Sequence, residues 1–196
     1  MTPERKQKLI SVLNKRQNDI TVVLENVSDP HNISAVMRTC DAVGVQDIYV
    51  LNTKIPRHQK WGTKSSSSAV KWLSIHQFEN AEACFETLRK SYSTILTTHL
   101  SSDAVSLHKV DFTKSTAIVF GNEHGGVSEE IRKLADGNVI IPQMGIIRSL
   151  NISVACAVTL YEAYRQKERA GHYNQSRLDN VRMNNLLEDW GLEEEV

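Results

Sequence analysis

The stretch Ile141–Ala157, IPQMGIIRSLNISVACA, decides the fold. The apolar run 139–141 ends at Pro142, a pattern typical of a buried strand that stops abruptly. A loop follows, and then a helix whose N-cap is Ser149 or Asn151, because either side chain offers an oxygen to the backbone N–H groups of the first turn. Apolar residues cover most of the circumference of this helix, which predicts that it is buried in a core or an interface.

On both sides of this stretch, strand-like and helix-like segments alternate along the chain. Apolar, β-branched runs predict strands over residues 20–24, 47–51, 73–76, 93–98, 117–120 and 139–141. Helices are expected over residues 3–16, 32–43, 80–91 and 128–135, and again after residue 178. This alternation predicts an α/β fold in which helices flank a parallel sheet. We expect one domain, with a helical extension over residues 1–18, a core over 19–170 and a C-terminal tail over 171–196.

The composition is that of a soluble globular protein. The 196 residues are 40% hydrophobic with a formal net charge of zero, and no apolar run approaches the roughly 18 residues that a membrane span needs. The N-terminus lacks the apolar segment of a signal peptide, so a cytoplasmic location and no membrane partner are expected. Cys40, Cys84 and Cys156 lie far apart and no His pair has ligand spacing, so we expect buried thiols and no metal.

Basic residues gather in two places although the net charge is zero. Residues 52–71 contain five Lys or Arg and no Asp or Glu, and residues 1–16 contain five more against Glu4. The end of the chain is acidic. Two interpretations stay open on charge alone: an electrostatic footprint for a polyanion, or an ordinary solvated surface.

Two other stretches carry residues that packing alone does not explain. Asn32–Val45, NISAVMRTCDAVGV, places Asn32 at or before a helix start and Arg38 nearly two turns later. An N-cap and a surface arginine would be the simpler interpretation. The stretch 118–130, IVFGNEHGGVSEE, follows a predicted strand with closely spaced glycines, but it is neither a Walker A loop nor a GxGxxG fingerprint. A glycine turn does not explain Glu123.

These two stretches and the run with Pro142, Met144, Gly145 and Ser149–Asn151 occur in the order of three known signatures. They resemble those of the SpoU-type RNA 2′-O-methyltransferases, within the SPOUT superfamily. Residues 16–39 are most similar to the tRNA guanosine-18 branch of that family. The resemblance implies a C-terminal deep trefoil knot in the α/β fold and a homodimer formed through the knot region. It also implies S-adenosylmethionine as cofactor and methylation of the ribose 2′-hydroxyl of guanosine 18 in the tRNA D-loop.

The resemblance also assigns site residues. The cofactor-binding residues that it implies are Thr98, His99, Leu100, Gly121, Asn122, Glu123, Ile141, Met144, Ser149 and Leu150. Its catalytic residues are Arg38, Asn32, Glu123, Ser149 and Asn151. Because a guanidinium has a pKa above about 12, an orienting and electrostatic role for Arg38 is favoured. A neutral arginine that acts as the base is the rival hypothesis.

RNA contacts are expected from basic residues near the chain ends. The candidates are Arg5, Lys6, Arg16, Arg165, Lys167 and Arg169. The first predicted strand begins at Ile20, which leaves no room before it for the separate RNA-binding domain of many ribosomal-RNA members and favours tRNA as substrate. The alternatives are 2′-O-methylation of another tRNA position or of ribosomal RNA, and a non-catalytic RNA-binding module.

Overall fold

The computed structural model describes residues 1–58 and 69–192, and part of the predicted basic loop lies outside these ranges. Its centre is a seven-stranded sheet in the order β3-β2-β1-β6-β4-β7-β5, and every pairing between neighbouring strands is parallel. The strands are β1 (Ile20–Glu25), β2 (Asp47–Leu51), β3 (Ser74–Phe78), β4 (Thr94–Thr98), β5 (Val105–Ser106), β6 (Thr116–Phe120) and β7 (Gly137–Ile140). The predicted parallel sheet is confirmed. The sequence missed β5, because two residues are too few to show an alternation.

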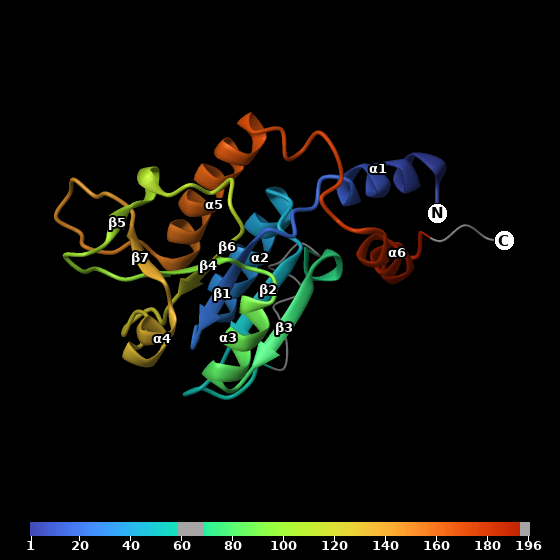
Figure 1. Ribbon diagram of the computed structural model, residues 1–196. Helices are drawn as coiled ribbons and strands as arrows, with labels where there is room; N and C mark the ends of the chain where they lie inside the picture. Colours follow the sequence, from blue (N-terminus) through green and yellow to red (C-terminus); the bar gives the residue numbers. More distant parts are fainter. Residues whose placement is uncertain (59–68, 193–196) are drawn as a thin grey trace.

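Helices cover both faces of the sheet, as Figure 1 shows. They are α1 (Pro3–Leu13), α2 (Pro30–Ala42), α3 (Ala81–Arg89), α4 (Glu129–Leu134), α5 (Ile152–Arg169) and α6 (Asn180–Asp189), with short 3-10 turns η1 (Ala69–Trp72) and η2 (Leu107–Lys109). One core cluster joins α2 and α5 to β1 and β6. A second cluster joins α3 and α4 to the other face. Cys40, Cys84 and Cys156 are free and buried, as predicted.

The helix caps confirm most of the predicted starts and correct one. Thr2 and Ser128 cap α1 and α4 through their side chains, and Asn151 rather than Ser149 caps α5. In contrast, α2 begins at Pro30 with Asp29 as its N-cap, two residues earlier than predicted. Asn32 therefore lies inside the first turn, and its side-chain amide is available for contacts elsewhere.

The two chain ends pack together beside the sheet. Leu13 of α1 joins Leu178, Leu186 and Trp190 in a third buried cluster, and the Trp190 ring meets Trp72 edge-on with the ring centroids 5.0 Å apart. The tail therefore docks on the body of the same chain. Val181 of α6 faces away from this cluster and is 71% exposed.

Candidate functional site

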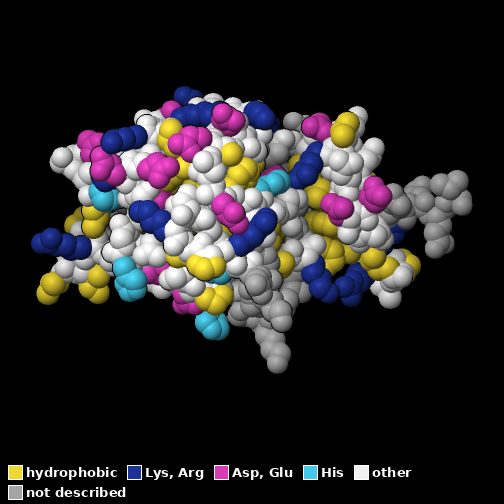
Figure 2. Space-filling model, turned by 90° about the horizontal axis from the view of Figure 1, so that it is seen from below, with side chains coloured by type: hydrophobic (Ala, Val, Ile, Leu, Met, Phe, Trp, Pro, Cys, Tyr) yellow, Lys and Arg dark blue, Asp and Glu magenta, His cyan; other side chains and the backbone are white. Residues whose placement is uncertain are grey.

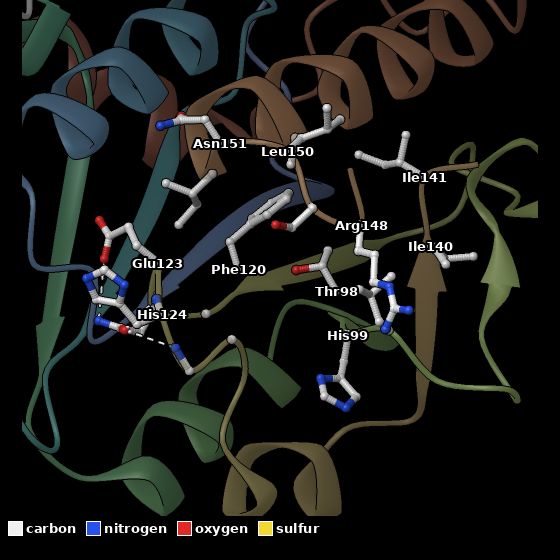
Figure 3. A pocket seen from close by; sticks show the side chains of 18 of the residues that line it. Thr98, His99, Phe120, Glu123, His124, Ile140, Ile141, Arg148, Leu150 and Asn151 are labelled. Carbon is white, nitrogen blue, oxygen red and sulfur yellow. Dashed lines mark hydrogen bonds between the residues drawn. The ribbon is translucent and has the colours of Figure 1, made fainter. Parts of the chain in front are cut away.

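A cavity of about 580 Å³ opens where β4, β6 and β7 end, as expected for ligand sites in parallel sheets. Its lining comes from the last residues of these three strands, from the segments that follow them and from the start of α5. In Figure 3, Glu123 and His124 lie on one side, Ile140 and Ile141 on the other, and Phe120 between them. Two of the three stretches singled out in the sequence, 118–130 and 141–157, therefore meet at this end of the sheet.

The glycine-rich stretch after β6 folds into a tight turn that forms one wall. A Cβ built on Gly121 would lie 2.1 Å from the carbonyl carbon of Gly126, so only glycine fits there. Asn122 and Gly126 exchange two backbone hydrogen bonds of 3.1 and 2.9 Å. The Oδ1 atom of Asn122 also accepts hydrogen bonds from the backbone N–H groups of His124 and Gly125. This turn holds Glu123 at the rim of the cavity.

A chain of hydrogen bonds joins the three signature stretches through their side chains. Asn151 donates from Nδ2 to Oδ1 of Asn32 over 3.1 Å, and Asn32 donates from Nδ2 to Oε1 of Glu123, also over 3.1 Å. The Oδ1 atom of Asn151 accepts from the backbone N–H of Ser153 and so caps α5 at the same time. We call this Asn151–Asn32–Glu123 series the polar relay. Its bonds fix the start of α2 and the start of α5 against the glycine turn.

Glu123 is held as a carboxylate. Its Oε2 atom accepts from the backbone N–H and hydroxyl of Ser28, and its Oε1 atom accepts from the backbone N–H of Asp29. Partial burial raises the pKa of Glu123. The hydrogen bonds from Asn32 and from backbone N–H groups lower it by more, so the pKa lies below its ordinary value. At neutral pH Glu123 accepts hydrogen bonds and does not act as a proton donor.

The structure brings the predicted cofactor residues together around one cavity, with one exception. All of them line it except Met144, which is 94% exposed in the loop between β7 and α5. Of the predicted catalytic residues, Glu123, Ser149 and Asn151 line the cavity. Asn32 reaches it through the polar relay.

Arg38 is the remaining predicted catalytic residue. It is exposed on α2 and is not among the described residues that line the cavity. Six residues of α-helix turn a side chain by about 240° relative to Asn32. Arg38 therefore leaves α2 on a different side of the helix from Asn32.

The resemblance assigned no site role to several other lining residues. They are Phe120, His124, Gly125, Gly126, Val139, Ile140, Gln143, Arg148, Ile152 and Ala155. Arg148 lies beside Thr98 and His99 in Figure 3 and brings a positive charge to the cavity. As the cation directly before Ser149, it could have been found from its place in the loop between the strand and the helix.

Two of the six predicted RNA contacts are wrong. The side chain of Arg16 is completely buried and forms an ion pair of 2.6 Å with Asp41. Lys167 is also completely buried and lies 2.8 Å from Asp19. Neither side chain can reach a phosphate. Arg5, Arg165 and Arg169 are exposed and Lys6 is partly exposed, although Arg165 is paired with Glu162.

Two other kinds of site are absent from the described part of the chain. Residues 1–58 and 69–192 contain no group of three or more His, Cys, Asp or Glu side chains placed to hold a metal ion. None of the helices in these ranges combines the length and the apolar character that crossing a membrane requires.

The cavity at the strand ends and the polar relay beside it are formed by the stretches that resemble the signatures of RNA 2′-O-methyltransferases. A model of the SpoU rRNA Methylase family matches residues 19–161, and the chain belongs to this family. Within it, the chain is 42% identical over 191 residues to a tRNA (guanosine(18)-2'-O)-methyltransferase of Thermus thermophilus, and the match covers 96% of each protein. It is 37% identical to the enzyme of that name from Escherichia coli, with 97% of this chain and 83% of the relative covered.

Solved structures agree with this assignment. The TrmH/SpoU tRNA modifying enzyme of A. aeolicus superposes with a TM-score of 0.89 at 37% identity, over 98% of both chains. The SpoU methyltransferase AviRb of Streptomyces viridochromogenes, in complex with the cofactor AdoMet, has a TM-score of 0.69 at 26% identity, over 80% of this chain and 62% of that one.

Proposed function

We propose that this protein is an S-adenosylmethionine-dependent methyltransferase that modifies the ribose 2′-hydroxyl of guanosine 18 in tRNA. The observation that carries the proposal is the polar relay, because it joins all three family signatures beside one cavity. The relatives from Thermus thermophilus and Escherichia coli bear that name and match this chain over nearly its whole length. With tRNA as the proposed substrate, we propose a cytoplasmic location.

The residues of the cavity suit S-adenosylmethionine. A volume of about 580 Å³ lies within the usual range of roughly 300–1,000 Å³ for small-molecule sites. Apolar side chains of Ile140, Ile141 and Leu150 would cover an adenine ring, while Arg148 would attract the carboxylate of the amino-acid part. We propose that the chain around residues 141–150 is threaded as a deep trefoil knot and that the cofactor is held inside it. Bound S-adenosylmethionine supplies a methyl group that is already activated on a sulfonium.

The protein must then align the 2′-hydroxyl and assist the loss of its proton, which is chiefly a matter of positioning. We assign this task to Arg38, as an orienting cation rather than a base. Glu123 is ionised and its lone pairs are engaged by neighbouring N–H groups, so it holds the geometry of the site. Ser149 contacts the cofactor or the acceptor ribose.

We propose that a homodimer completes the site. Large apolar side chains are exposed on the loop before α5 and along α5 itself, namely Met144, Ile146, Ile147, Leu150, Val154, Val158 and Tyr161. In Figure 2, hydrophobic side chains gather at the end of the molecule where Figure 1 places this loop. Exposed apolar surface of this kind marks interfaces. Because Arg38 is not among the described residues that line the cavity of its own chain, a second copy would present Arg38 of the partner subunit.

The N-terminal extension and the last turns of α5 are proposed to hold the tRNA. Since Arg16 and Lys167 are buried, four candidate phosphate contacts remain: Arg5, Lys6, Arg165 and Arg169. A second cavity of about 420 Å³ between α1 and residues 173–176 offers amide and hydroxyl groups and Lys15 beside them. We keep the division into an extension (1–18), a catalytic core (19–170) and a tail (171–196). The family match over residues 19–161 supports the start of the core.

The direct test is transfer of a labelled methyl group from S-adenosylmethionine to unmodified tRNA, followed by mapping of the modified nucleotide. Label at the 2′-oxygen of guanosine 18 supports the proposal. Label at another tRNA position, or in ribosomal RNA only, supports the alternative substrates. Cofactor binding and RNA binding without any transfer would indicate a non-catalytic RNA-binding module.

Arg38→Ala should abolish methyl transfer and leave the affinity for S-adenosylmethionine nearly unchanged. Arg38→Ala and Glu123→Gln subunits, mixed and allowed to exchange, then test the dimer. If Arg38 acts on the partner's cavity, each mixed dimer keeps one complete site and part of the activity returns. If Arg38 acts within its own chain, the mixture stays inactive. Near-normal turnover of Arg38→Ala alone would remove this residue from the mechanism.

A further inference from the structure

We propose that Asn138 is a positioning residue that fixes the loop Thr98–Ser101 in the shape that binds the cofactor. The inference rests on the proposed function, because it concerns the same cavity. Thr98, His99 and Leu100 line this cavity, whereas Asn138 is not a lining residue. Its part is therefore to hold the wall and not to touch the ligand.

One side-chain amide brackets the loop from two sides. The Oδ1 atom of Asn138 accepts a hydrogen bond of 2.8 Å from the backbone N–H of His99. The Nδ2 atom donates to the carbonyl oxygen of His99 over 2.6 Å and to Oγ of Ser101 over 2.7 Å. Both backbone groups of one loop residue are thus satisfied by a single side chain.

The position of Asn138 in the sheet explains why an amide is needed. Strand β4 pairs with β7 through Thr97 opposite Asn138 and Thr98 opposite Val139, and β4 ends there. Beyond this point the loop leaves the ladder, and its backbone groups need new partners. A primary amide has adjacent acceptor and donor atoms, as a peptide group does. Asn138 therefore continues the hydrogen-bonding pattern of the sheet for one further residue.

A separate contact holds the ring of His99. Arg132 donates from Nη1 to Nε2 of His99 over 3.2 Å, and because arginine only donates, Nε2 must be the acceptor nitrogen. The Nδ1 atom then carries the proton and faces the glycine turn, since a Cβ built on Gly126 would lie 3.9 Å from it. The wall from β4 and the wall from β6 meet at this ring. A shift of the loop would therefore change the cavity on both sides.

The test compares Asn138→Asp and Asn138→Ala with the unaltered full-length protein. Asp has nearly the same size as Asn, but it brings an acceptor oxygen against the carbonyl of His99 where Asn had a donor. If the hydrogen bonds of Asn138 hold the loop, both variants should weaken S-adenosylmethionine binding and raise its KM by about tenfold or more, as for a lost buried hydrogen bond. The KM for tRNA should stay within about twofold.

Gln46→Ala is the matched control. Gln46 is a fully buried amide that donates to Ser74 beside β2 and β3, away from the cavity. Its loss should lower the midpoint of thermal unfolding without changing the KM for S-adenosylmethionine. If Asn138→Asp does not fold, Asn138→Ser is measured by the same criterion.

Two outcomes would overturn the proposal for Asn138. One is a folded Asn138→Asp or Asn138→Ser protein that binds S-adenosylmethionine as tightly as the unaltered protein. The other is an equal rise in the KM values for cofactor and tRNA, because a general loss of structure explains that better. If the unaltered protein binds no S-adenosylmethionine, the proposed function itself fails, and calorimetric titration of that protein shows this separately.

Discussion

Two polar regions of this molecule are built in different ways, although both join parts of the chain that are distant in sequence. At the cavity, two neutral amides and one carboxylate form the polar relay, and Glu123 keeps its charge at a partly open rim. At the chain ends, full charges are buried. Arg16 donates hydrogen bonds to Asp41 and to backbone carbonyls, and its guanidinium lies over the ring of Trp190.

The difference follows from what each region has to do. A site that binds a ligand needs polar atoms held in place but still reachable, and amides provide this at a small desolvation cost. A buried ion pair is costly to form and more costly to break on one side. It therefore suits the attachment of α1 and α6, where nothing has to enter.

The largest expected effect comes from breaking the buried pair. Arg16→Met leaves Asp41 without its guanidinium partner and should lower the free energy of unfolding by about 3 kcal/mol, the low end for buried pairs, because Asp41 is 34% exposed. Urea unfolding measures this. In the folded protein, the dependence of tRNA binding on salt should not change.

Arg5→Met is the control on the same helix. Arg5 is exposed, so its loss should change stability by less than about 0.5 kcal/mol. If Arg5 contacts a phosphate, the salt dependence of tRNA binding should become less steep by about one unit of slope. A stable Arg16→Met protein with weakened tRNA binding would show that Arg16 contacts the RNA.

Arg5 and Arg16 show what could not be predicted from the sequence. Both lie in a basic N-terminal segment and gave the same signal, because charge counts do not reveal a partner 25 residues away such as Asp41. Lys167 was misjudged for the same reason, since Asp19 lies far from it along the chain. Periodicity and capping, which depend on near neighbours, predicted the parallel sheet and gave Asn151 as one of two candidate caps of α5.

The candidate site was predictable in part. The order of the three signatures indicated which loops meet, and the cavity is lined by those loops. The inner bonds were not predictable, because Asn32 was expected at the helix start. The cap Asp29 moves the start of α2 and directs Asn32 to Glu123. The hydrogen bonds from Asn138 to the loop after β4 could not be predicted from the sequence, since they depend on the register between β4 and β7.

A smaller effect is expected when the polar relay is changed. Glu123→Gln replaces an acceptor oxygen by an N–H₂ group that would face the donors of Ser28, Asp29 or Asn32. Methyl transfer should fall about 100-fold, the cost of a misplacement near 1 Å, which corresponds to about 2.7 kcal/mol. Single-turnover kinetics at saturating cofactor measures it.

The stability of Glu123→Gln distinguishes the relay from the buried pair. Because the rim is partly open, the free energy of unfolding should change less than in Arg16→Met. The lowered pKa of Glu123 means that its contribution to stability is present above pH 4.5, its ordinary value, and is lost as pH falls through the lowered value. A Glu123→Gln protein with unaltered turnover would show that the relay is only structural.

The smallest expected effect is the pH response of His172, which lies with Lys167 and Arg177 around Asp19. Burial, and then the charge of Lys167, lower the pKa of His172 below 6.5, against the opposing effect of Asp19. The folded state then binds fewer protons than the unfolded state, so the protein loses stability as pH falls below 6.5. His172→Asn removes this penalty. Relative to the unaltered protein, the free energy of unfolding of this variant should therefore rise as pH falls from about 8 to about 5.5. A difference that stays constant over this range would show that the ring accepts a proton without cost.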